Sequence, residues 1–238
     1  MGRFQNIIKL LEERSYINVL VTFFELTAIF TSLLYIRKDK VRVLFLLYLL
    51  FDLNALLYDF YVETSDSITG REASRLILFT NTLVCGIELI VYYHFFISII
   101  QNTVIIRLMK IIRVLFIALI AIFISTSFKF LTHRYEYVSQ VIGSIEFILL
   151  LLPALAYFYE ILRNDSVVNL FQRPSFWVAT GIFFFALISI PYYLICTFFR
   201  DVQYEGLQVL NLVFYYLPLA VNFIFLTKAF LCKRALTI

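Results

Sequence analysis

Long apolar runs, joined by short polar segments, set the strongest limit on how this chain can fold. Seven runs of 18 to 25 residues follow one another, and no segment between them exceeds 15 residues. About 20 apolar residues in a helix cross the ~30 Å hydrocarbon core of a bilayer. The sequence therefore predicts one all-α domain over residues 1–238, a seven-transmembrane-helix bundle. The predicted spans are 16–36, 43–61, 76–100, 114–131, 141–161, 177–199 and 207–230.

The composition excludes other classes of protein. Hydrophobic residues make up 62% of the chain and charged residues 15%, which a soluble globular domain or a disordered chain does not show. The net charge of +4 is spread over the connecting segments, so we expect no binding to nucleic acid. The lipid bilayer is the expected partner.

Cysteine and histidine residues are too scattered to indicate a metal centre. Cys85, Cys196 and Cys232 are far apart, and His94 and His133 lie in different segments. These spacings match neither a zinc site nor a disulfide framework. The sequence also contains no Ser-His-acid set and no phosphate-binding loop. We therefore expect no metal, no cofactor, no catalytic residue and no enzymatic activity.

The first 15 residues precede the first span and carry one apolar face. Phe4, Ile7, Ile8 and Leu11 are spaced three or four residues apart, as in an amphipathic helix. Such a helix either lies in the membrane interface or forms a solvated cap on the bundle. The sequence leaves both arrangements open.

Lys and Arg residues predict the orientation of the bundle. With residues 1–15 left out, twelve lie on one side of the predicted spans and five on the other. Cytoplasmic segments of membrane proteins carry the excess of Lys and Arg. We therefore predict an outside amino terminus and a cytoplasmic carboxyl terminus, with the basic clusters 37–42 and 107–113 in the cytoplasm.

The second predicted span carries two aspartates where a lipid-facing helix should carry none. Tyr48, Asp52, Ala55 and Asp59 fall at i, i+4, i+7 and i+11, so they share one stripe of a helix. An ionised carboxylate in hydrocarbon costs at least about 2.5 kcal/mol. The stripe is therefore predicted to face other helices.

Acidic residues recur near the middle of two further spans, Glu25 in the first and Glu88 in the third. Acids that lie close together in a low dielectric cannot all be ionised, so we expect a shared proton, or a bound cation or amine. The alternative is a purely structural network of hydrogen bonds between helices. The predicted polar core consists of Glu25, Asp52, Glu88, Tyr48, Asn211, Tyr215 and Asn222.

A second polar layer is predicted nearer the outer surface, as a shallow cup. Lys129 in this layer either pairs with Glu146 or Asp59, or extends its amine to the lipid headgroups. The outer cup is predicted from Asp59, Asn81, Lys129, Glu146, Tyr192 and Tyr193.

Three prolines lie inside the last three predicted spans. Each proline removes a backbone hydrogen bond and favours a kink, so this half of the bundle could bend between two packings. The predicted hinges are Pro153, Pro191 and Pro218.

Several short segments resemble one family of bacterial membrane proteins. They are residues 34–38, 46–52, 88–93, 159–164, 174–181 and 222–234, and the most specific is the Pro-x-Phe-Trp element that begins at Pro174. The family comprises small seven-helix proteins that stand alone or form the membrane part of sensor histidine kinases. The resemblance implies a sensory role in the inner membrane with a kinase partner. This sequence itself holds no phosphoacceptor or ATP-binding segment, so we expect no kinase activity.

The resulting expectation is a receptor-like sensor or signalling subunit in the bacterial inner (cytoplasmic) membrane. A small ligand or lipid, which the sequence does not identify, would shift the proline-containing helices. Residues 107–113 and 162–175 would pass the change to a histidine kinase or another membrane protein. Two alternatives remain: a proton- or cation-coupled transporter or channel that uses the same acids, and a structural subunit of a membrane complex.

Overall fold

The structure is a computed structural model that describes residues 16–35, 40–64, 70–130, 135–163, 170–198 and 212–232. In this part of the chain all regular structure is helical, so the all-α prediction is confirmed. The helix predicted within residues 1–15 and the predicted core residue Asn211 lie outside the described residues. The elements are α2 (Tyr16–Leu34), α3 (Lys40–Thr64), α4 (Gly70–Ile99), α5 (Thr103–Phe130), α6 (Tyr135–Arg163), the 3-10 helix η2 (Leu170–Gln172), α7 (Pro174–Phe198), the π-helix η3 (Leu212–Tyr216) and α9 (Leu217–Leu231).

Six helical segments of the described chain are long and apolar enough to cross a membrane. They contain 19 to 24 residues, against the roughly 20 that a bilayer requires. Five belong to α3, α4, α5, α6 and α7, and the sixth, Val213–Leu231, joins η3 to α9. The apolar part of α2, Val19–Leu34, is shorter. These lengths and compositions indicate a multi-pass membrane protein.

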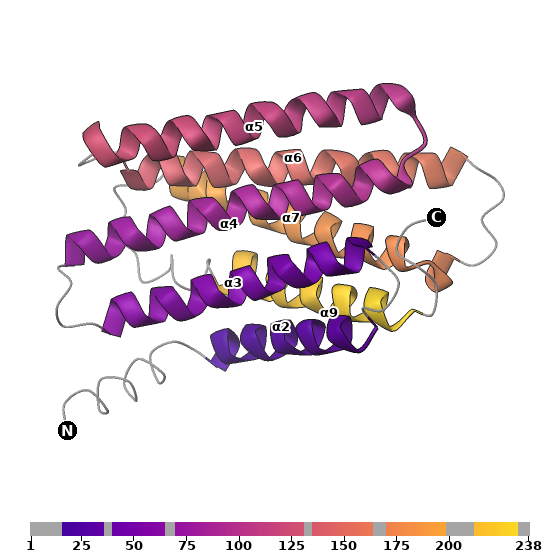
Figure 1. Ribbon diagram of the computed structural model, residues 1–238, viewed down its shortest axis with the longest axis horizontal. Helices are drawn as coiled ribbons and strands as arrows, with labels where there is room; N and C mark the ends of the chain where they lie inside the picture. The colour runs from indigo at the N-terminus through magenta and orange to yellow at the C-terminus, as the bar shows by residue number, and fades with distance from the viewer. Residues whose placement is uncertain are drawn as a thin grey trace.

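Six helices pack side by side as a closed ring. The order around the ring is α2, α3, α4, α6, α7 and α9, and α9 closes it by packing against α2 (Figure 1). Helix α5 lies outside the ring, at the edge formed by α4 and α6. Because α5 carries the chain back outside the ring, α4 and α6 become direct neighbours. Side chains from six helices can therefore meet in the interior.

The surface of α5 fits its place outside the ring. Its inner face carries Met109, Phe116, Ile120 and Phe123, which are buried and recur at i, i+7, i+11 and i+14, the spacing of one helix face. Large aliphatic side chains cover its outer face and are exposed in the structure, as a lipid-facing helix requires. They include Val104, Leu108, Ile111, Val114, Leu115 and Ile122.

Helix α5 begins at Thr103, earlier than the predicted start of that span at residue 114. The Oδ1 atom of Asn102 accepts hydrogen bonds from the backbone N–H groups of Val104 (3.0 Å) and Ile105 (3.3 Å), which caps the helix start. Segment 107–113, predicted as a loop, is therefore helical. The predicted span began after the basic residues 107–113 because charged residues interrupt an apolar run. A helix can nevertheless continue through charged residues.

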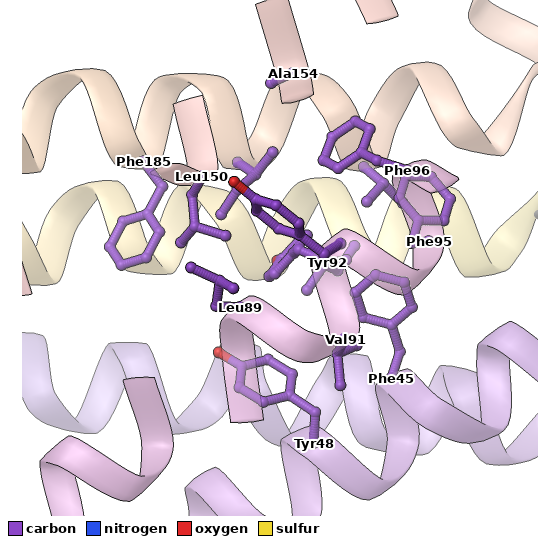
Figure 2. Packing of buried hydrophobic residues seen from close by; sticks show 14 of the residues in the cluster. Phe45, Tyr48, Leu89, Val91, Tyr92, Phe95, Phe96, Leu150, Ala154 and Phe185 are labelled. Atoms are coloured by element: carbon purple, nitrogen blue, oxygen red, sulfur yellow. The ribbon is translucent and has the colours of Figure 1, made fainter. Parts of the chain in front are cut away.

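Aromatic side chains fill the ring next to its polar residues. The Phe45 ring of α3 meets the rings of Tyr92 (5.3 Å between centroids) and Phe95 (5.6 Å) of α4 edge to face. Figure 2 shows Tyr48, Leu150 and Phe185 in the same buried cluster. Edge-to-face pairs stabilise such contacts beyond the area that they bury. Aromatic packing, rather than small-residue contact, dominates this interior.

Arg42 joins three helix ends at one end of the ring. It lies in the first turn of α3 and is buried, although the sequence placed it in a cytoplasmic loop. Its guanidinium donates hydrogen bonds to the backbone oxygens of Tyr35 (3.4 Å), Phe230 (3.2 Å) and Cys232 (3.1 Å). Helices α2 and α9 therefore end side by side, and the cation stabilises both carbonyl ends.

Gly181 permits the closest approach between α7 and α9. A Cβ atom at this position would lie 2.7 Å from Asn222 Oδ1 and 2.9 Å from Phe225 Cβ. Both distances are shorter than van der Waals contact, and one involves an atom next to the backbone. The absence of a side chain at Gly181 therefore fixes the position of Asn222 inside the ring.

The variant Gly181→Ala is expected to lower the free energy of unfolding by about 1 to 3 kcal/mol, as overpacking does in a tight core. Gly86→Ala is the matched control, because a Cβ there would meet only the flexible side chain of Ile120, with its terminal Cδ1 methyl at 3.0 Å. Alanine also favours the helix, so this control should match or exceed the wild-type stability. Thermal unfolding in one detergent compares them, and an equal loss in both would contradict the close contact.

Candidate functional site

Four carboxyl groups from four helices of the ring lie in its interior. Glu25 of α2 and Glu146 of α6 are each 1% exposed, Glu88 of α4 is 6% exposed, and Asp52 of α3 is partly buried. Asp52 interacts electrostatically with each of the other three, and Glu88 also interacts with Glu146. We call these four residues the acid core.

Three oxygens of the acid core lack a hydrogen-bond partner. Among the described residues, none bonds to the buried Oε1 atoms of Glu25, Glu88 and Glu146. Buried polar atoms without partners are rare in folded proteins, because each leaves a desolvation cost uncompensated. If the acids are ionised, no hydrogen bond from a described residue compensates the burial of these three oxygens.

Basic side chains lie away from the acid core. Of the Lys and Arg side chains that the structure describes, all but Arg113 lie near the end of the ring where α2, α4, α6 and α9 finish, and Arg113 lies about three turns into α5, outside the ring. Four carboxylates at close range, without these cations, cannot all be ionised. Protons or a bound cation must therefore reduce their charge. The basic residues concerned are Lys40, Arg42, Arg107, Lys110, Arg113, Arg163, Arg173 and Lys228.

The acids of the core are not grouped as the ligands of one metal ion. Within the described ranges, no group of three or more His, Cys, Asp and Glu side chains could hold a metal ion.

Polar side chains from α3, α4 and α9 surround the acid core. Tyr48 interacts with Glu88, and the Cys85 thiol interacts with Glu146. Across the ring, Asn222 Nδ2 of α9 lies 3.0 Å from the Tyr92 hydroxyl of α4, with both side chains fully buried. This pair links α4 to α9 and places an amide beside the acids.

An aromatic wall borders the acid core on the side of α7 and η3. The Tyr193 ring lies 5.0 Å from the Phe147 ring and 6.0 Å from the Tyr215 ring, measured between centroids. Tyr193 fits against α6 because Gly143 has no side chain there; a Cβ would lie 2.5 Å from the Tyr193 ring. Tyr193 interacts with Glu146, and Tyr215 interacts with Asp52 and Glu88.

The structure brings most of the predicted polar core together. Glu25, Asp52, Glu88, Tyr48 and Tyr215 form one interacting group. Asn222 joins it through its bond to a tyrosine that interacts with Glu88.

The residues of the predicted outer cup lie in different surroundings. Glu146, assigned to the cup, lies with the core acids, because α6 begins earlier than predicted and this residue sits deeper in the helix. Asn81 is exposed, while Asp59, Tyr192 and Tyr193 are partly buried. The side chain of Lys129 lies outside what the structure describes, so its pairing stays a prediction.

The predicted hinge prolines occupy three different settings. Pro153 is buried within α6, and Pro191 is exposed within α7; both helices continue through them. Pro218 lies in the first turn of α9, where the π-helix η3 passes directly into the α-helix. Bending at any of the three prolines remains a prediction.

Sequence reasoning missed Cys85 and Glu160. The sequence shows Cys85 only as an isolated cysteine, and its proximity to Glu146 appears only in the structure. Glu160 lies near the end of α6, and its two carboxylate oxygens accept hydrogen bonds from the backbone N–H groups of Gln101 (3.0 Å) and Asn102 (2.9 Å). It ties the end of α6 to the start of α5.

Two isosteric variants distinguish these acids. Glu160→Gln is expected to lower the unfolding free energy by about 1 kcal/mol, because an amide cannot accept both N–H bonds and has no charge. Glu146→Gln should leave it unchanged or raise it at pH 7, because a neutral amide removes a poorly compensated buried carboxyl. Thermal unfolding measures both. A larger loss for Glu146→Gln would instead assign that residue to a structural hydrogen-bond network.

Comparison with known proteins adds no family to this description. No protein-family model, no curated protein and no solved structure matches the chain. The resemblance to sensor-associated bacterial membrane proteins therefore remains an expectation from the sequence.

Proposed function

We propose that this chain is a multi-pass membrane sensor or signalling subunit whose acid core changes charge when it binds protons or a cation. The observation that carries the proposal is the acid core itself, four carboxyl groups from four helices with no described cation beside them. A core that only held the helices together would be better served by neutral, fully bonded side chains.

The charge of the acid core acts directly on helix packing. Repulsion between two unit charges grows as the surroundings become less polar. One added positive charge therefore lowers the electrostatic repulsion between several pairs of helices at once. Helices α2, α3, α4 and α6 each contribute one acid and would shift relative to one another. Such a shift requires that the proton or cation bind one packing more tightly than the other.

The proposed topology places all seven helices, α2 included, across a bacterial inner membrane. The end of the ring that holds most of the described Lys and Arg side chains is then cytoplasmic, in agreement with the excess of positive charge expected there. The first turns of α5 and the start of α7 lie at this end and offer the partner surface. A histidine kinase is the proposed partner.

Purification from native membranes followed by kinase assays tests this proposal. A histidine kinase should co-purify, and Glu88→Gln should change its phosphorylation several-fold, because the variant fixes one core position as neutral. Ser98→Ala is the control, since Ser98 is exposed on the same helix. If no kinase co-purifies and phosphorylation is unaffected by Glu88→Gln, the signalling role is rejected.

A proton- or cation-coupled transporter is the second candidate. It is favoured by the partly buried Tyr192, Tyr193 and Tyr215, which extend from the acids toward the end of the ring opposite Arg42. Ionisable groups inside a membrane often mark ion pathways.

Flux through proteoliposomes measures transport directly. Wild-type protein should dissipate an imposed pH or cation gradient, Asp52→Asn should abolish this flux, and Asn54→Ala should retain it, because Asn54 is exposed on the same helix. Absence of wild-type flux would exclude transport of the ions tested and leave the sensor proposal in place.

A further inference from the structure

We propose that the ligand of the acid core is an organic ammonium ion, held between the carboxyl groups of Glu88 and Glu146 and the rings of Tyr193, Tyr215 and Phe147. We call these five residues the ammonium site. This inference rests on the proposed function, because it names the ligand class for the same core. It commits to a protonated or quaternary amine rather than to an inorganic ion.

The carboxyl side of the ammonium site requires a positive charge. Glu88 and Glu146 belong to neighbouring helices, interact with one another, and are at least nine-tenths buried. Among the described residues, each has an Oε1 atom without a hydrogen-bond partner. One cation between them would compensate both groups, and a protonated amine would donate the missing hydrogen bonds.

The aromatic rings of the ammonium site offer ring faces, which bind an organic cation and which an inorganic ion does not require. Tyr193 lies against Gly143, which is three residues before Glu146 and on the same side of α6, and the Phe147 ring centroid lies 5.0 Å from that of Tyr193 and 6.4 Å from that of Tyr215. The negative faces of aromatic rings attract ammonium groups within about 6 Å, and more strongly where water is excluded. Rings and carboxylates together therefore form a cation-recognition set.

The composition of the site selects against other cations. No described cluster offers the three or more His, Cys, Asp or Glu ligands that would hold a metal ion. Most described Lys and Arg side chains lie at the far end of the ring, and Arg113 belongs to α5, outside the ring. An alkylammonium ion is satisfied by two carboxylates and ring faces alone.

The site also lies where backbone geometry is irregular. Tyr215 belongs to the π-helix η3, which the first turn of α9 follows directly. Single π-helical turns are rare and are frequently found at functional sites. Tyr193 and Tyr215 are only partly buried, so the ammonium site reaches toward the end of the ring opposite Arg42.

Thermal unfolding of the full chain in a maltoside detergent, which carries no ammonium group, tests the proposal. Tetramethylammonium chloride or methylammonium chloride would replace sodium chloride at constant ionic strength. At least one of the two should raise the unfolding midpoint in a saturable way. Glu146→Gln and Tyr215→Leu should each weaken the apparent affinity tenfold or more, whereas Tyr193→Phe should retain it because the ring remains.

Tyr159→Leu provides the control, since Tyr159 is exposed on the same helix as Glu146 and should not alter the response. A saturable response that survives both Glu146→Gln and Tyr215→Leu would overturn the site. An absent response to both ammonium salts, or an equal saturable response to sodium, would overturn the ammonium assignment. Neither result affects the kinase assay with Glu88→Gln, so failure of the ligand class and failure of the signalling role remain distinguishable.

Discussion

The burial of four carboxyl groups inside one ring of helices is the constraint on which the rest of the structure depends. Helix α2 shows how strictly it acts: Glu25 is 1% exposed, while Phe23 and Phe30 on the opposite side are 63% and 61% exposed. Lipid accepts the phenylalanines but not the acid, so the helix can adopt only one rotation. The same requirement on α3, α4 and α6 turns four helices toward a common interior and leaves their apolar faces outward.

The direction in which each helix runs then determines how the ends of the ring are stabilised. Two pairs of ring neighbours finish at the same end, α2 with α9 and α4 with α6, so their partial negative charges accumulate. The guanidinium of Arg42 compensates the first pair. At the second pair, Glu160 accepts hydrogen bonds from the backbone N–H groups of Gln101 and Asn102, which directly precede α5. Both contacts hold the end at which a cytoplasmic partner would bind.

The sequence predicted the helices and the inward face of the core for the same physical reason. A charge inside an apolar run is costly, so Glu25, Asp52 and Glu88 had to face protein, and helical spacing gave the stripe. The order of helices around the ring was not predictable, because it depends on contacts between segments distant in the chain. Glu146 and Arg42 were misplaced because apolar runs give the depth of a span poorly: a charged residue near its end is helical and buried as readily as it is exposed in a loop.

Ring closure by α9 has a consequence for biosynthesis. The helix that seals the interior against α2 is synthesised after every other described helix, and it brings Asn222, the partner of Tyr92. Until α9 enters the bilayer, the acids of the earlier helices are not enclosed by a complete ring and contact water, lipid or the insertion machinery. Insertion and final packing are therefore separate events in this protein. A nascent chain arrested between α7 and α9 would hold the carboxyl groups of α2, α3, α4 and α6 in the membrane without the helix that closes the ring around them.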